Sequence, residues 1–307
     1  MSAALEFATD PIDPSRLAQA VQELAIVQPS LRAWLLIDAA LLNSERLESA
    51  LHRNGWSYAN ALATTPLAAY GAQGPQLLEI PRGDDVLAEG VQRLASIGPG
   101  APAFSWLVSR QPIEQLQACF GYLAQARQDG LKLHCRMSDT RVLPALLATL
   151  SGSQARRVAQ AIAQWQWFDR DGTTGNWLAP ALEEGAVDTG DHLELDTLQF
   201  ASLLDAAEAD GIFAQLLETV SQLVPQTGRS LFHRQLQRAL EIATSLHVTG
   251  NPDRLQFVVL SLTCGEDFYK RPALSDTWRA VAQGARLTAL MKDWSDDLWN
   301  TLEDRTR

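Results

Sequence analysis

Histidine and cysteine side chains are the first candidates for metal or nucleophilic chemistry in this sequence. His134 and Cys135 form the one adjacent His/Cys pair, inside a stretch in which apolar and polar residues alternate from Leu131 to Met137. The alternation predicts a strand, and neighbours on a strand point to opposite faces, so the two side chains cannot chelate one metal ion together. Structural zinc also needs four ligands at recognisable spacing. We therefore predict no metal site and no cofactor, and we expect Cys135 in the core.

Paired carboxylates are the next candidates, because two of them can do general acid and base chemistry. They occur at Glu183–Glu184 and at Glu194 with Asp196. Polar flanks favour exposed loop or cap positions for both clusters, which explains them without catalysis. The loop that begins at Asp169 lacks the Gly and the Glu that a calcium-binding loop requires, and the sequence contains no G-x-S-x-G, P-loop or dinucleotide fingerprint. We therefore expect a protein that is not an enzyme.

The charge and the apolar content of the sequence limit which classes of partner we expect. The 307 residues include 36 acidic and 25 basic side chains, a net charge of −11. Such a surface repels phosphate backbones, so we expect no nucleic-acid partner. The first residues lack a basic start and an apolar core, and the apolar stretch from Ala33 to Leu42 is interrupted by Asp38 and is too short to span a bilayer. With three scattered cysteines, these features predict a protein of the reducing cytoplasm with no membrane partner.

Short apolar or alternating segments in the first half predict strands. These segments are residues 33–38, 76–80, 104–109, 131–137, 164–168 and 176–178. Alternation puts Phe104, Trp106 and Val108 on one face, and the last two segments flank a polar turn that predicts a hairpin.

Helical periodicity lies between these strands and dominates the second half. A helix is predicted from Pro112 to before Gly130, and Ser138 or Asp139 can cap the next one. The sequence thus predicts an α/β (α+β) fold. Its domains are a mixed-sheet N-terminal lobe, residues 1–185, and a mostly helical lobe, residues 186–307.

The tryptophans divide into core and interface candidates. Trp165 and Trp167 share a strand face and are expected in the core, whereas Trp177 is open to either role. Trp294 and Trp299 are five residues apart, so both cannot lie at the centre of one helical stripe, and one of them is the better interface candidate.

Three sequence blocks occur in an order and spacing that resemble one family. Residues 34–40 read WLLIDAA and are similar to an opening strand that ends in Asp-Ala-Ala. Residues 106–109 read WLVS and are similar to a central strand, and residues 135–143 read CRMSDTRVL, similar to the family sequence FRFYDPRVL. The family is that of the adaptor chaperones of bacterial type VI secretion, long known as a domain of unknown function. The resemblance covers about residues 30–170, as much as one domain.

The third block keeps the polar residues of the family sequence and lacks its aromatic residues and its proline. The matching residues are Arg136, Asp139, Arg141, Val142 and Leu143. The resemblance implies that its polar members, with Asp38 and Trp106 of the other blocks, form a structural or partner-binding set. From its position we expect Asp139 to be a helix N-cap and Arg136 to join an Arg–Asp pair that fixes the strand-to-helix corner.

The resemblance also implies a function. The protein would be a cytoplasmic adaptor that binds the N-terminal region of a secreted effector and promotes its loading onto a VgrG or PAAR spike component. Two alternatives stay open. One is an immunity-type protein that neutralises a toxin, and the other is an enzyme whose site is assembled from residues distant in the sequence.

Overall fold

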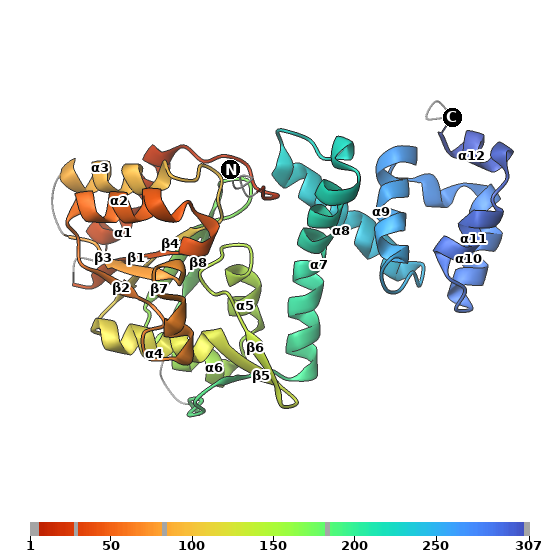
Figure 1. Ribbon diagram of the computed structural model, residues 1–307. Coiled ribbons are helices and arrows are strands. Elements are labelled where there is room, and N and C mark those ends of the chain that lie inside the picture. Colours follow the sequence, from red (N-terminus) through yellow and green to blue (C-terminus); the bar gives the residue numbers. More distant parts are fainter. Residues whose placement is uncertain (1–5, 28–29, 82–84, 182–184, 304–307) are drawn as a thin grey trace. The chain divides into compact units, whose positions relative to one another are not determined.

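The computed structural model describes residues 6–27, 30–81, 85–181 and 185–303 (Figure 1). The chain divides into two compact units, Met1–Ala207 and Glu208–Arg307. The division falls inside helix α7 (Thr197–Thr219), whereas the sequence pattern puts the change of domain at residue 185. Residues 193–203 belong to the first unit because strand β9 and the first turns of α7 pack against its core.

The first unit is built on two sheets, and its α+β class with a mixed sheet region confirms the prediction. Its strands are β1 (Arg32–Ile37), β2 (Tyr58–Asn60), β3 (Gln76–Glu79), β4 (Phe104–Ser109), β5 (Gln125–Gln128), β6 (Leu131–His134), β7 (Gln164–Phe168), β8 (Thr174–Leu178) and β9 (Leu193–Glu194). The large sheet has the order β2-β3-β1-β4-β7-β8, and all its neighbouring strands are antiparallel. In the small sheet, β5 pairs with β6 antiparallel and with β9 in parallel.

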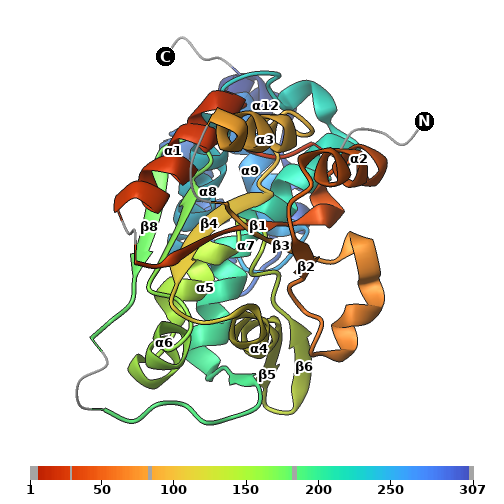
Figure 2. The same ribbon diagram turned by 90° about the vertical axis from the view of Figure 1, so that its left-hand side faces the viewer.

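Helices cover both faces of the large sheet (Figures 1 and 2). The helices of this unit are α1 (Pro14–Val27), α2 (Ser44–Asn54), α3 (Asp85–Ala95), α4 (Ile113–Ala124), α5 (Leu143–Thr149) and α6 (Gly152–Ala159). The strands alternate between two cores. Leu35 and Trp106 pack with the helices α1, α2 and α3, whereas Trp34, Leu107 and Trp165 pack with α4, α5 and α6. Successive residues of a strand point to opposite faces, and both faces are covered here. Each residue therefore enters an apolar core, which explains why these strands are continuous apolar runs in the sequence.

Two predicted elements end earlier in the structure than in the sequence pattern. The helix expected to reach Gly130 ends at Ala124, because Gln125–Gln128 forms β5, a strand paired on both sides. The strand expected to reach Met137 ends at His134, and the chain then turns back toward the large sheet. Pairing with distant segments overrides the local pattern at both places.

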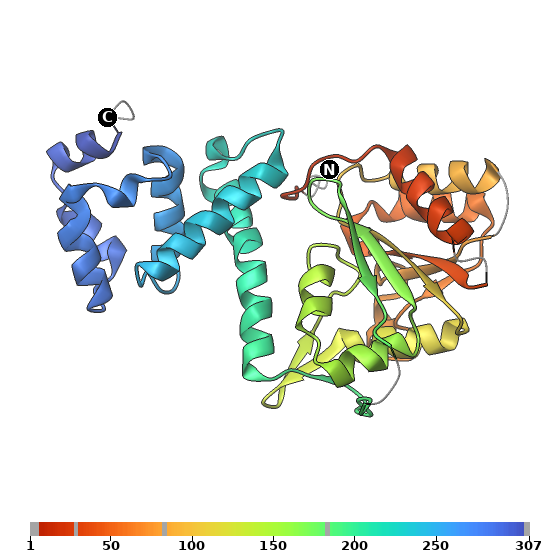
Figure 3. The ribbon, with the colours of Figure 1, turned by 180° about the vertical axis from the view of Figure 1, so that it is seen from behind.

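The second unit is helical. Besides the end of α7, it contains α8 (Arg229–Ser245), α9 (Asp253–Cys264), α10 (Ser275–Ala282), α11 (Leu287–Leu290) and α12 (Asp296–Glu303), which Figure 3 shows from behind. Phe257, Phe268 and Trp278 form an aromatic cluster with ring centroids 5.0 to 6.0 Å apart. None of the helices in the described ranges combines the length and apolar character that a membrane span needs.

Candidate functional site

Four of the five residues singled out in the sequence meet at one end of the large sheet. Asp38 directly follows β1, and its backbone N–H donates to the Ala103 carbonyl just before β4 at 2.8 Å. The segment 136–141 reaches the same place because the Thr140 N–H donates to the Pro102 carbonyl at 2.9 Å. We call Asp38, Arg136, Ser138, Asp139 and Arg141 the charged corner.

Asp38 connects two segments of the charged corner. Its carboxylate is almost completely buried, and each oxygen accepts one hydrogen bond. Arg136 Nη2 donates to Oδ1 at 2.9 Å and the Ser138 hydroxyl donates to Oδ2 at 2.8 Å. A buried carboxylate needs such donors to remain charged. Asp38 therefore ties the end of β1 to the segment after β6.

Asp139 and Arg141 form a second, tighter pair. Arg141 Nε and Nη2 donate to the two carboxylate oxygens of Asp139 at 3.0 and 2.6 Å, and the Arg141 backbone N–H adds a third bond at 3.0 Å. Asp139 is 1% exposed. The bidentate geometry fixes the orientation of the guanidinium, as is typical of arginine–carboxylate pairs.

The pairing differs from the expected one. Arg136 was expected to join the Asp beside the strand-to-helix corner, but it pairs with Asp38, and Asp139 pairs with Arg141. Asp139 also does not cap α5, which begins at Leu143 after Val142 without a side-chain cap. Its side chain closes the turn at Arg141 instead, and its carbonyl accepts the N–H groups of Val142 and Leu143. The sequence could not show this because Asp38 is about a hundred residues away.

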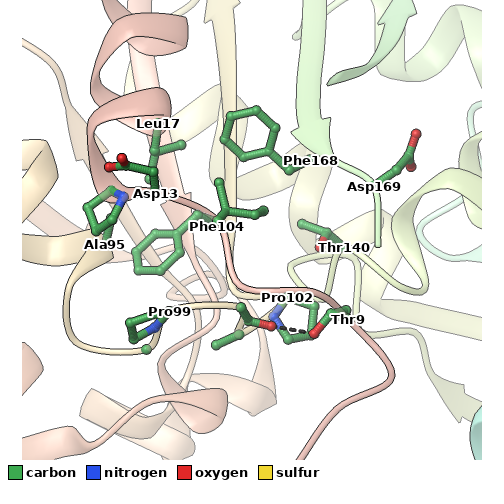
Figure 4. A pocket seen from close by; sticks show the side chains of 15 residues that line it. Thr9, Asp13, Leu17, Ala95, Pro99, Pro102, Phe104, Thr140, Phe168 and Asp169 are labelled. Carbon is green, nitrogen blue, oxygen red and sulfur yellow. Dashed lines mark hydrogen bonds between the residues drawn. The ribbon is translucent and has the colours of Figure 1, made fainter. Parts of the chain in front are cut away.

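The N-terminal segment lies beside the charged corner. The Arg141 guanidinium carbon is 5.0 Å from the centroid of the Phe7 ring, a cation–π distance. The Thr9 hydroxyl donates to the Gly100 carbonyl (Figure 4). The Asp10 N–H donates to the Arg170 carbonyl at 2.8 Å. No motif in the sequence signals these contacts.

A small cavity lies between this segment and the start of β4 (Figure 4). Its volume is about 40 Å³, and its lining includes Thr9, Asp13, Phe104, Thr140 and Phe168. That volume holds a few water molecules at most. The cavity is too small for an organic substrate.

Trp106, the fifth residue of the set, lies in the core and not in the charged corner. Its ring is fully buried 4.9 Å from that of Phe168, and its Nε1 donates to Gln166 Oε1 at 2.8 Å. Its neighbours on β4, Phe104 and Val108, share the same core as predicted.

The other tryptophans also have definite places. Trp165 and Trp167 are buried, which confirms the prediction, and Trp177 is half-buried. Trp294 precedes α12 and contacts Trp299 with ring centroids 5.0 Å apart, so the two lie together and not on separate faces of one helix.

The remaining candidates for chemistry have environments that disfavour reactivity. Burial raises the pKa of the Cys119 thiol to about 12 and that of Cys135 to about 11, so both are protonated at neutral pH and poor nucleophiles. Cys135 is half-buried, not part of the fully buried core. Partial burial holds the pKa of His134 below its ordinary value, and nearby Arg136 adds to this effect. Among the described residues, no three His, Cys, Asp or Glu side chains are grouped so that they could hold a metal ion.

Of the two carboxylate clusters, the structure describes the one at Glu194 and Asp196, whose side chains have separate environments. Asp196 accepts the Gln199 N–H at 2.8 Å while the Gln199 side chain accepts the Asp196 N–H at 2.9 Å, a reciprocal cap at the start of α7. Glu194 is exposed on β9. Glu183 and Glu184 lie outside the described residues.

Comparison with known proteins finds a similarity within the first unit. No curated protein and no solved structure matches the chain. Residues 33–157, which include most of β1, all of β4 and α4, the whole charged corner and most of α6, match the family model described as a domain of unknown function (DUF4123).

Proposed function

We propose that the protein is a cytoplasmic adaptor that binds a type VI secretion effector and promotes its loading onto a VgrG or PAAR spike component. The observation that carries the proposal is the match of residues 33–157 to the DUF4123 model, a family associated with effector adaptors of this secretion system. The partner is a protein, and no nucleic acid, membrane, metal or cofactor takes part.

The charged corner supports a binding role. The side chain of Arg136 is 37% exposed, while its carboxylate partner Asp38 is buried. Only one of the five guanidinium N–H groups binds Asp38 within the described part of the chain, so others can donate to a partner's carbonyl or carboxylate oxygens. Asp38 thus fixes a donor group in place before a partner arrives, which lowers the entropy that binding costs.

The reactive groups support binding over catalysis. The two thiols with raised pKa are not activated nucleophiles, and the cavity beside the charged corner has no room for an organic substrate. We therefore favour a non-enzymatic role over a site assembled from distant residues.

A pull-down tests the proposal. Tagged protein is isolated from its native cells under conditions in which the secretion system is expressed, and bound proteins are identified by mass spectrometry. Recovery of one secreted toxin together with a spike component supports the adaptor role. Recovery of a toxin whose activity the protein abolishes supports the immunity-type alternative, and recovery of no specific protein contradicts both.

A matched pair of variants then tests the charged corner with the recovered client. Arg136→Lys keeps a positive charge beside Asp38 but loses the planar array of donors. We expect the affinity for the client to fall about tenfold, as for the loss of a charge-assisted hydrogen bond. Arg238→Lys changes an exposed arginine of the second unit, paired with Glu266 at 3.4 Å, and should leave the affinity unchanged. Equal affinities of the two variants would remove Arg136 from the binding site.

A further inference from the structure

Strand β8 is one of the two edges of the large sheet, and its outer side carries regularly spaced backbone groups. Among the strands that the structure describes, it pairs with β7 alone, with Trp165 opposite Trp177 and Trp167 opposite Gly175. The Asp169 N–H donates to the Thr173 carbonyl, and the Ala179 N–H donates to the Ala163 carbonyl. Hydrogen-bonded pairs alternate with non-bonded pairs in an antiparallel ladder. Odd-numbered residues of β8 therefore face β7 with their backbone groups, and even-numbered residues face away from it.

The outward-facing groups are those of Thr174, Asn176 and Leu178. Within the described residues, no hydrogen bond reaches their backbone N–H or carbonyl groups. They form a row of three donors and three acceptors with the spacing of an extended strand.

The opposite edge of the sheet is protected, whereas no residue in the described part of the chain bonds to the outward backbone groups of β8. At β2, the Gln117 side chain donates to the Asn60 carbonyl at 2.9 Å, and the adjoining 3-10 segment Pro66–Gln73 contacts the strand through the Asn60 side chain. Natural sheets also prevent their edge strands from pairing with other chains by means of lysine, proline or bulges. Strand β8 has neither a charged residue nor a proline over its five residues.

The backbone of β8 is held firmly against its neighbour. A Cβ atom on Gly175 would lie 2.2 Å from Nε1 of Trp167, so only glycine lets β8 lie this close to that indole. The Gln164 side chain also donates to Asn176 Oδ1 at 2.8 Å. The row of outward-facing groups is thus fixed before any partner binds.

The side chains of β8 and the charge of the protein determine which kind of segment can bind at this edge of the sheet. Leu178 is 62% exposed on one face of β8, and Trp177 is half-buried on the other. At the turn before the strand, Asp169 and Asp171 are offset by Arg170 and by Arg16, which donates to the Gly172 carbonyl at 2.8 Å, whereas the chain as a whole has a net charge of −11. An extended segment with apolar residues beside Leu178 and Trp177 and a positive net charge matches both features. Pairing of two copies would bring together two chains of the same negative charge.

We propose that the outer edge of β8 binds an extended, apolar and basic segment of the client protein by β-strand addition. The inference rests on the proposed adaptor function and names the surface that holds the client. The segment forms main-chain hydrogen bonds with Thr174, Asn176 and Leu178, so affinity comes from backbone groups and selectivity from the side chains beside Trp177 and Leu178.

Two substitutions test the edge with the client identified by the pull-down. Asn176→Pro removes an outward N–H without removing a backbone hydrogen bond between β7 and β8, although it also removes the side-chain bond from Gln164, and Leu178→Lys adds a charge to the edge. We expect each to weaken client binding at least tenfold. The matched control is Leu131→Lys, at a leucine 54% exposed on β6, a strand that already carries Lys132. It should bind the client like the unmodified protein.

Backbone hydrogen exchange distinguishes a direct contact from a folding defect. In the unmodified protein, the client should slow exchange at the amides of Thr174, Asn176 and Leu178 at least tenfold and leave those of Gly175 and Trp177 little changed, because these two already bind β7. Client binding with no change at the three amides, or with full affinity in both edge variants, overturns the strand-addition inference and leaves the adaptor function intact. Protection of the three amides in the protein alone at high concentration, together with a dimer in sedimentation, would assign the edge to a second copy and also overturn it. Failure of the unmodified protein to bind any client contradicts the adaptor function itself.

Discussion

Asp38 in the first unit and Asp253 in the second are both buried carboxylates that hold together distant segments, and they do so with different donors. Among the described residues, the Asp38 carboxylate accepts bonds from two side chains, those of Arg136 and Ser138, 98 and 100 residues away. Asp253 accepts from the backbone N–H groups of Leu287 and Thr288, from the Thr288 hydroxyl, and from Arg286.

The difference in donors gives the two carboxylates different roles: Asp253 is structural, whereas Asp38 positions the guanidinium of Arg136. Backbone donors at the start of α11 account fully for Asp253, because unpaired N–H groups at a helix N-terminus require acceptors. Both arginines are partly exposed, so exposure alone does not distinguish them. Asp253 stays hydrogen-bonded without Arg286, whereas Asp38 keeps a single donor without Arg136. The charged corner therefore depends on its arginines, and the Asp253 cluster does not.

The largest expected effect follows the removal of Arg141. Arg141→Ala leaves the carboxylate of Asp139, which is 1% exposed, without its bidentate partner. We expect the free energy of unfolding of the first unit to fall by about 3–5 kcal/mol. Urea unfolding measures the change, and Arg32→Ala is the control because its pair with Glu79 is exposed and 3.7 Å long and should contribute below about 1 kcal/mol. Equal losses in both variants would contradict a special role for the Asp139–Arg141 pair.

Removal of Asp253 should come next. Asp253→Ala leaves two backbone N–H groups at the start of α11 without their acceptor, at an expected cost of about 2–3 kcal/mol to the second unit. Hydrogen exchange of peptides from α9 and α11 in urea reports this loss. Asp276→Ala, which breaks an exposed pair with Arg279, should cost less than about 1 kcal/mol, and a loss as large as that of Asp253→Ala would rule out the capping explanation.

The two arginines provide the sharpest contrast between the units. Arg136→Ala should destabilise the first unit by about 2 kcal/mol, because Asp38 stays buried with one donor. Arg286→Ala should destabilise the second unit by less than about 1 kcal/mol, because three of the four hydrogen bonds to the Asp253 carboxylate remain in place. Thermal unfolding of both variants measures the difference. A larger loss for Arg286→Ala would reverse the comparison.

The smallest expected effect is on the stability of the second unit at low pH. Burial tends to raise the pKa of Asp253, but hydrogen bonds from Thr288, Arg286 and Leu287 outweigh it and hold the pKa below its ordinary value. Because the folded pKa is the lower one, the stabilisation is present above the ordinary carboxyl pKa of about 3.9 and is lost as the pH falls through the folded pKa. The unfolding free energy of the second unit should therefore decline below about pH 4, and Asp253→Asn should lose this part of the decline. An identical pH profile for Asp253→Asn would show that other groups cause it.

The sequence predicted the strands better than the contacts that join them. Apolar runs and alternation located β1, β3, β4, β7 and β8 because period two is a local property of the chain. The same local pattern gave the wrong end for the helix at Gly130, since the pairing of β5 involves the distant strand β9.

The sequence predicted which residues form the candidate site but not which of them pair with one another. The motif residues Asp38, Arg136, Asp139 and Arg141 do meet, but the pairing of Arg136 with Asp38 joins positions 98 residues apart in the sequence. The contact of Phe7 with Arg141 has no signal in residue type or spacing. Partner choice among charged groups depends on three-dimensional proximity, which one sequence does not encode in any local pattern.

Secretion of the client tests the adaptor function most directly. The gene is deleted in native cells, and the client identified by the pull-down, a second effector and the secretion-tube protein are quantified in cells and in culture supernatant. We predict that the client disappears from the supernatant, that the other two are secreted as before, and that the unmodified gene restores the client while the Arg136→Lys variant restores less of it. Unchanged secretion of the client in the deletion strain would contradict the adaptor function.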